Sequence, residues 1–304
     1  MVYTGETPIE HNGKKVVAFL ESGEWTVPDG VTRVDVLVVA GGGSGGAGNH
    51  VAGGGGGAGG VIFEEDFSIT DESSPISITV GDGGEGVEDS SRESGNKGEN
   101  SVFLTLTAIG GGGGGGRESS ANDGGSGGGG GHHGDGIAGS TEDSTQGYDG
   151  GDAGAWDGSW YRTGGGGGGS GENGNDATSS ACGDGGDGLD YSTQFGTTYG
   201  EDGVFAGGGG GSDKEHNNPG SGGLGGGGDG ASYDVSIPTE DINAKENTGG
   251  GGGATNAEAN SYSGNGGSGI VIIAYEEPFE VTTNAATNVS FESATLNGEI
   301  GGLE

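Results

Sequence analysis

The chain has little of what most folded proteins use to build a core. Of its 304 residues, 27% are hydrophobic, 6% are aromatic and only 6 are proline. This composition excludes a large conventional core but leaves room for one small β core. The single cysteine, Cys182, excludes an internal disulfide and a cysteine-based metal cluster. Residues 1–15 lack an apolar signal region and no run approaches ~18 apolar residues, so we expect no export signal and no membrane insertion.

Positive charge is also scarce. Lys and Arg total 9 against 46 Asp and Glu, which gives a formal net charge of −37 spread along the chain. Nucleic acid and anionic membranes are therefore disfavoured as partners. In molar salt the screening length falls to about 3 Å and the self-repulsion nearly vanishes, so we interpret the composition as adaptation to a hypersaline medium. The alternative is a partly disordered acidic protein that is indifferent to salt.

Glycine is what the chain has in abundance, with 85 residues in recurring runs between Gly41 and Gly269. Glycine loses more backbone entropy on folding than any other residue, so a flexible linker is the simplest interpretation. A linker normally joins two elements once, whereas here the runs recur, and strand-like sequence stands before the first and after the last. The pattern therefore indicates a glycine array inserted into one folded unit.

Glycine runs can be ordered as extended helices of the polyproline II type, with about 3 residues per turn and no internal hydrogen bonds. Their outward N–H and C=O groups must then pair with neighbouring glycine helices. Each such bond contributes a net of roughly 1 kcal/mol, which barely offsets the lost entropy, so the lattice must be cooperative. Collagen is excluded, because 85 glycines are accompanied by only 6 prolines and no strict Gly-X-Y repeat.

Short apolar runs on either side of the array predict β-strands. The clearest is 32–40, in which valines alternate with other residues up to the first glycine run. Further strands are expected at 15–20, 22–30, 61–63, 67–70, 76–80, 101–109 and 269–275. We predict a mainly β fold with essentially no α-helix, in which about seven strands form a small β-sandwich head. The head takes 1–109 and 268–276, including a glycine insertion at 41–60, and carries a polyglycine II bundle at 110–267.

These segments carry a family resemblance. The residues involved are Glu-Trp-Thr-Val-Pro-Asp-Gly-Val at 24–31, the strand 34–40 that leads into glycines, Ile-Thr-Val-Gly at 78–81, and Gly-Gly-Ser-Gly-Ile-Val-Ile at 266–272. Together they resemble the glycine-rich domain of bacteriophage tail-fibre adhesins, over roughly 21–275. The resemblance implies a β head that carries packed polyglycine II helices, whose distal loops contact the host surface. It also implies a location in the virion, release by lysis, other tail-fibre or virion proteins as partners, and a homotrimer as one assembly. The family is usually less acidic, which suggests a halophilic host.

Two longer loops between the glycine runs, 132–163 and 170–206, hold the candidate binding residues. Trp and Tyr give a large contact area at small entropic cost. At the distal tip they would bind a host cell-surface receptor, either a glycan or a surface-layer protein. The alternative is that they cap the bundle or pack against the β head. The predicted receptor-binding residues are Tyr148, Trp156, Trp160, Tyr161, Arg162, Tyr191, Phe195 and Tyr199.

Catalytic and metal-binding motifs do not stand out from this background. Residues 185–190 match the start of a calcium-binding nonapeptide repeat once, but Ser192 stands where an apolar residue belongs. The histidines lack metal-ligand spacing, and no Ser-His-Asp arrangement is distinguishable. We expect no enzyme activity, no cofactor and no metal site beyond incidental binding of Ca, Mg, Na or K ions by surface carboxylates.

The composition changes again at Pro278. Residues 281–289 and 293–299 resemble the opening of a fibronectin type III-like domain, for which 277–304 has room for about two strands. For the whole chain we expect a viral tail-fibre adhesin that binds the host cell through tip loops. The alternative is a structural subunit of an extracellular filament or cell-surface coat of a halophilic prokaryote.

Overall fold

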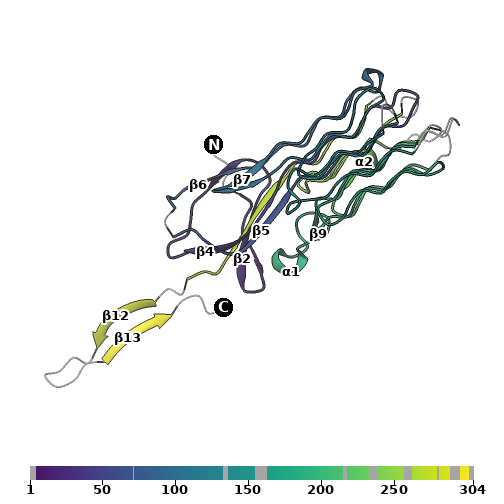
Figure 1. Cartoon of the computed structure of the whole chain (residues 1–304). Coiled ribbons are helices and arrows are strands. Elements are labelled where there is room, and N and C mark those ends of the chain that lie inside the picture. Colours follow the sequence, from purple (N-terminus) through teal and green to yellow (C-terminus); the bar gives the residue numbers. More distant parts are fainter. Residues whose placement is uncertain are drawn as a thin grey trace.

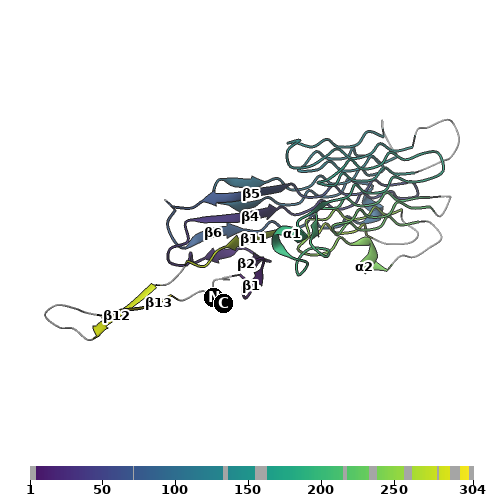
Figure 2. The same ribbon diagram turned by 90° about the horizontal axis from the view of Figure 1, so that it is seen from below.

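A computed structural model describes residues 5–70, 72–132, 136–154, 163–214, 218–232, 238–256, 262–278, 281–287 and 295–300. The chain forms a head of β-sheets, a bundle of extended segments that projects from it, and a two-stranded hairpin on the other side of the head (Figures 1 and 2). The predicted mainly β fold is confirmed. Helices in the described part are single turns: the 3-10 helix η1 (Asp89–Ser91), α1 (Ser192–Phe195) and α2 (Thr239–Ile242). None of these is long or apolar enough to cross a membrane.

The head contains two antiparallel sheets. The larger has the strand order β1 (Ile9–His11), β2 (Lys14–Phe19), β11 (Ile270–Tyr275), β4 (Arg33–Val39) and β5 (Val61–Ser68). The smaller has the order β3 (Gly23–Trp25), β6 (Ile76–Thr79), β7 (Ser101–Phe103) and β8 (Leu106–Ala108). In the larger sheet Ile270 lies opposite Val39, so the strand that follows the glycine array pairs with the strand that precedes it.

Both faces of the larger sheet are buried. One face packs on the smaller sheet around Phe19, Trp25 and Phe103. The other face is covered by the segment 189–206, which contains β9 (Leu189–Asp190), α1 and β10 (Val204–Phe205). This two-sided burial explains why β11 and the second half of β4, from Val36 to Val39, have continuous apolar sequence rather than polar alternation.

Three details of the head differ from the sequence prediction. Residues 101–109 form a hairpin rather than one strand, because Leu104 adopts a φ of 52° between β7 and β8. Residues 61–63 and 67–70 are not separate strands, since β5 runs through most of this region with a register shift opposite Val34 and Val36. The short strands β1, β9 and β10 were not predicted.

The glycine segments bond to one another with a period of three residues. In 41–47, every third amide donates to the same neighbouring segment, and the carbonyls repeat with the same step where their partners are described. Three residues per turn with all bonds between segments is the pattern of packed polyglycine II helices. The segments bonded to 41–47 are 54–57, 93–99, 264–267, 111–117 and 252–255, together with Gly84.

Side chains are excluded from the middle of this lattice. A Cβ atom on Gly42 would lie 1.9 Å from the carbonyl oxygen of Gly250, and one on Gly55 would lie 2.0 Å from that of Gly209. The glycine insertion 41–60 and the segment 81–100, which sequence reasoning placed with the head, run along the bundle instead. Residues 41–47 are surrounded by the other segments.

The two strands expected after Pro278 are present as a hairpin. β12 (Val281–Thr287) and β13 (Thr295–Ile300) pair antiparallel, with Val281 opposite Ile300. The hairpin lies on the side of the head away from the glycine bundle in both views (Figures 1 and 2).

Candidate functional site

The bundle ends in a set of chain reversals far from the head. The chain leaves β4, runs along the bundle, reverses where the amide of Val51 donates to the carbonyl of Gly48 at 3.2 Å, and returns as β5. η1 lies in the corresponding place between β6 and β7. The next reversal, at 117–120, follows the glycine run after β8, where the amide of Gly116 donates to the carbonyl of Ser119. We call 48–51, 89–92 and 117–120 the distal turns (Figure 1).

Asn49 connects the three distal turns. Its amide donates to Oδ1 of Asp89 at 3.0 Å, and its side-chain oxygen accepts from Arg92 Nε and Arg117 Nη1, each at 3.2 Å. Arg117 also donates to the Asn49 carbonyl at 2.8 Å, and Arg92 forms an ion pair with Glu118 at 2.9 Å. Because backbone and side-chain bonds converge on one residue, the distal turns are held in a fixed relation to each other.

Four of the predicted binding residues lie outside the described residues, in the segment 155–162: Trp156, Trp160, Tyr161 and Arg162. The residues that flank this segment are described. The amide of Gly154 donates to the carbonyl of Thr163 at 3.0 Å, and that of Gly164 donates to the carbonyl of Ser212. Ser212 Oγ in turn accepts from the amide of Gly53 at 2.8 Å, close to the first distal turn. The described residues on either side of this segment, Gly154 and Thr163, therefore lie at the distal end of the bundle.

Tyr148 lies on the side of the bundle rather than among the distal turns. Its carbonyl accepts from the amide of Gly127 at 2.9 Å, and its side chain is 43% exposed. It is available for contact, but the described structure does not bring it together with Asn49 or the other distal residues.

The remaining three predicted residues, Tyr191, Phe195 and Tyr199, pack on the head. Phe195 is 1% exposed and belongs to the apolar cluster on the second face of the larger sheet, against which Tyr191 and Tyr199 also pack. Burial raises the pKa of both tyrosine hydroxyls. This is the alternative considered from sequence, in which aromatic side chains stabilise the head, and it differs from the expected distal placement.

Local sequence explains how 189–206 folds against the head. Oδ1 of Asp190 accepts the amide of Ser192 at 2.8 Å as α1 begins. Gly196, Gly200 and Gly203 adopt φ values of 81°, 70° and 92°, which favour glycine. These turns bring β10 back beside β9 and direct the aromatic side chains inward.

Sequence reasoning missed Tyr262. Its side chain is 58% exposed, and its backbone forms an antiparallel bridge with Glu88, next to η1. The available signal was a tyrosine within the short polar segment 255–263, which lies between two glycine runs. Tyr262 adds an aromatic side chain to the distal end.

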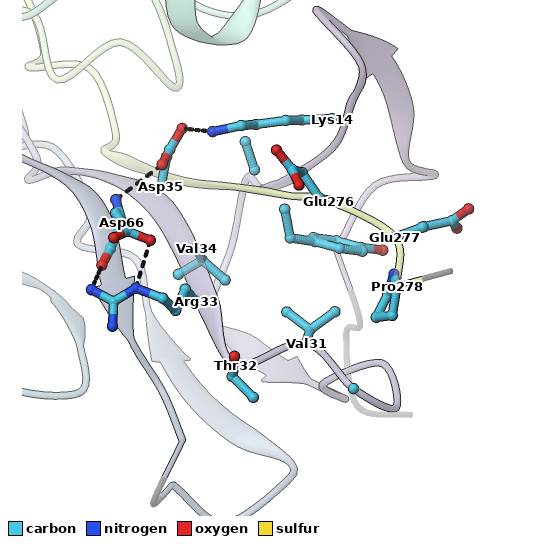
Figure 3. A pocket seen from close by; sticks show the side chains of 13 residues that line it. Lys14, Val31, Thr32, Arg33, Val34, Asp35, Asp66, Glu276, Glu277 and Pro278 are labelled. Atoms are coloured by element: carbon cyan, nitrogen blue, oxygen red, sulfur yellow. Dashed lines mark hydrogen bonds and ion pairs between the residues drawn. The ribbon is translucent and has the colours of Figure 1, made fainter. Parts of the chain in front are cut away.

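A hollow of about 350 Å³ lies in the head, where the chain passes towards the hairpin through Pro278 (Figure 3). Four of its charged residues are joined in a chain of contacts. Lys14 pairs with Asp35 at 2.5 Å, Arg33 Nε pairs with Asp66 at 2.5 Å, and the amide of Asp66 donates to Asp35 at 3.0 Å. Both basic side chains are neutralised locally, which favours a structural role at the junction.

The described residues do not contain a group of three or more side chains suited to hold a metal ion. Cys182 is buried, burial raises the pKa of its thiol, and its Sγ donates to the carbonyl of Ser212 at 2.9 Å. The thiol is therefore protonated and shielded, and it acts as a packing group.

Comparison with known proteins identifies a family for most of the chain. A family model described as a glycine-rich domain matches residues 18–276, which run from β2 through the bundle to β11. A search of curated proteins finds no match to the chain. Because the family model covers most of the sequence and ends where the larger sheet closes, the chain belongs to the glycine-rich domain family.

Proposed function

We propose that this protein is a virus tail-fibre adhesin that binds the host cell surface through the distal end of its glycine bundle. The observation that supports this proposal is the Asn49 network, which fixes three turns at the end of a lattice that is itself held by backbone bonds. Preorganised turns bind at lower entropic cost, because less ordering is required on association. A stiff projection with a fixed end surface is suited to reaching a receptor.

The proposed contact residues are the aromatic side chains of the distal end. Trp156, Trp160 and Tyr161 stand in the sequence between Gly154 and Thr163, which lie next to Ser212, and Tyr262 is exposed near η1. The receptor would be a host glycan or surface-layer protein. The net charge of −37 supports a halophilic host, and the head and hairpin would face the other tail-fibre proteins.

Cell binding by the purified protein tests the proposal. We expect the labelled protein, in molar KCl, to coat cells of a susceptible halophilic prokaryote and to block viral adsorption. The double variant Trp156→Ala/Trp160→Ala should lose this binding with an unchanged thermal midpoint. Tyr148→Ala is the matched control, because it removes an aromatic side chain from the side of the bundle and should leave binding intact.

Two results would contradict the proposal. One is full cell binding by the double tryptophan variant. The other is assembly of the wild-type protein into fibres without any cell binding, which would favour the structural subunit of a filament or cell coat.

A further inference from the structure

Three four-residue motifs on the outside of the bundle share a pattern. Asp-Gly-Gly-Asp occurs at 149–152 and 184–187, and Asn-Gly-Asn-Asp occurs at 173–176. Each places two side-chain acceptors three residues apart, which is one turn of a polyglycine II helix. Gly151 and Gly185 are buried, whereas Asp149, Asp152 and Asp184 are exposed. We call these three segments the rim motifs, because their glycines face the lattice and their acidic residues face outward.

The first rim motif, 149–152, accepts hydrogen bonds from backbone amides of the segment 136–141. Oδ1 of Asp152 accepts the amide of Ala138 at 2.9 Å, and Oδ1 of Asp149 accepts the amide of Thr141 at 2.7 Å. Between these two, the amide of Gly139 donates to a lattice carbonyl in the ordinary way. The amides at 138 and 141 thus receive a side-chain oxygen, with the same three-residue step by which inner segments receive backbone carbonyls.

The second rim motif, 173–176, accepts hydrogen bonds from backbone amides of the first. Oδ1 of Asn173 accepts the amide of Asp149 at 3.2 Å, and Oδ1 of Asp176 accepts the amide of Asp152 at 2.8 Å. Asp152 is therefore both a donor through its backbone and an acceptor through its side chain. The presence of asparagine at 173 indicates that a carbonyl oxygen is sufficient and that a negative charge is not required.

The third rim motif repeats the arrangement beside the second, whose Asn175 amide donates to the carbonyl of Asp184 at 2.9 Å. Oδ1 of Asp184 accepts the amide of Ser221, and Oδ1 of Asp187 accepts the amide of Leu224, both at 2.8 Å. The intervening amide of Gly223 donates to the lattice carbonyl of Gly208. Three neighbouring sites thus use the same spacing and the same type of acceptor.

We propose that the rim motifs terminate the glycine lattice and close its edge to a second copy of this chain. A lattice held by backbone bonds has the same difficulty as a β-sheet, whose unpaired edge is a template for another chain. The side-chain oxygens of the rim motifs occupy the outward amides, so these amides cannot bond to a further glycine segment. The exposed carboxylates add repulsion between copies. This inference does not depend on the proposed receptor binding.

Two double variants of the first rim motif distinguish the effect of the acceptor oxygen from the effect of the negative charge. Asp149→Asn/Asp152→Asn keeps both acceptors, whereas Asp149→Ala/Asp152→Ala removes them. Hydrogen exchange measured in molar KCl should show protected amides at Ala138 and Thr141 in the wild type and in the Asn variant. In the Ala variant both amides should exchange about fivefold faster, which corresponds to the loss of a bond of roughly 1 kcal/mol.

Self-association is the second measurement. Sedimentation velocity in the same salt should show concentration-dependent association of the Ala variant beyond that of the wild type and the Asn variant. If the double Ala variant fails to fold, Asp152→Ala alone tests the same idea, because Ala138 should lose protection while Thr141 keeps it. The proposal is overturned if the wild-type amides exchange freely, if the Asn and Ala variants behave alike, or if the Ala variant gains no association.

Discussion

The ring of Phe195 stands edge-on to the ring of Phe63, with their centroids 5.8 Å apart and their planes at 89°. Phe63 lies on β5 and Phe195 on α1, so the contact fastens the segment 189–206 to the second face of the larger sheet. Such edge-to-face pairs contribute about 0.5–1.5 kcal/mol beyond the area that they bury. An aromatic segment between glycine runs thus completes the core of the head.

Replacement of Phe195 by alanine should destabilise the protein strongly. The side chain is 1% exposed, and truncation of a buried phenylalanine costs about 3–5 kcal/mol. Urea unfolding in molar KCl measures this loss. Tyr148→Ala is the control, because a side chain that is 43% exposed should cost less than about 0.5 kcal/mol. Equal losses of unfolding free energy in the two variants would show that Phe195 does not hold the segment 189–206 against the larger sheet.

A methyl group in the middle of the lattice should also be poorly tolerated. The Cβ of Gly42→Ala would lie 1.9 Å from the backbone oxygen of Gly250, so the neighbouring segment must move, and we expect a loss of at least about 3 kcal/mol. Gly13→Ala is the control, because it measures the cost of backbone strain without a steric clash. Gly13 has a φ of +78° and nothing within 4 Å of the added atom, so only the strain of about 1–2 kcal/mol remains. Similar losses at the two positions would contradict the packed lattice.

Stability should rise with salt. The net charge of −37 repels itself at low ionic strength, and the screening length falls from about 10 Å at 0.1 M to about 3 Å at 1 M salt. We expect the thermal midpoint to increase over this range and the protein to unfold cooperatively on dilution. Sucrose is the control, because it favours burial without screening charge. A midpoint that responds to sucrose but not to KCl would remove the electrostatic explanation.

Acid should weaken the contact of Glu201 with the bundle. Partial burial raises the pKa of this carboxyl, but hydrogen bonds from the amides of Gly225 and Gly226 and from Lys245 bring it below its ordinary value of 4.5. A pKa that is lower in the folded state gives stability that is present above pH 4.5 and is lost as the pH falls through the folded value.

Glu201→Gln tests this pH dependence. The amide oxygen can still accept from Gly225 and Gly226, but the side chain no longer titrates. The wild type should be more stable than the variant near neutral pH, and the difference should shrink below pH 4.5. A difference that stays constant across this range would assign the effect to geometry rather than to ionisation.

The strands that border the glycine array could be predicted from sequence, because the valine-rich β4 leads into the first glycine run and the apolar β11 directly follows Gly269. The turn at Leu104 could not, since leucine is not a turn residue and its φ of 52° is imposed by the pairing of β7 with β8. The position of Phe195 could not be predicted either. The sequence of β11 indicates two buried faces, but it does not say which distant segment covers the second one.

The sequence contains only a weak indication of the hydrogen bonds that join the distal turns, but a clear indication of the rim motifs. Asn49 interrupts a glycine run with a residue that tolerates a positive φ, here 43°, but its partners come from two other reversals. The Asp-Gly-Gly-Asp motifs are visible in the sequence. Their meaning depends on knowing which amides face outward, and that follows only from the packing of the bundle.

The pairing of Ile270 with Val39 has a consequence for how this architecture can vary. The chain enters and leaves the array through adjacent paired strands. The larger sheet of the head can therefore form in the same way whatever the length of the array. Adding or deleting three residues in each segment would change the reach of the projection by about 9 Å per turn. Proteins with this architecture can thus change the length of the glycine bundle without changing the β-sheets of the head.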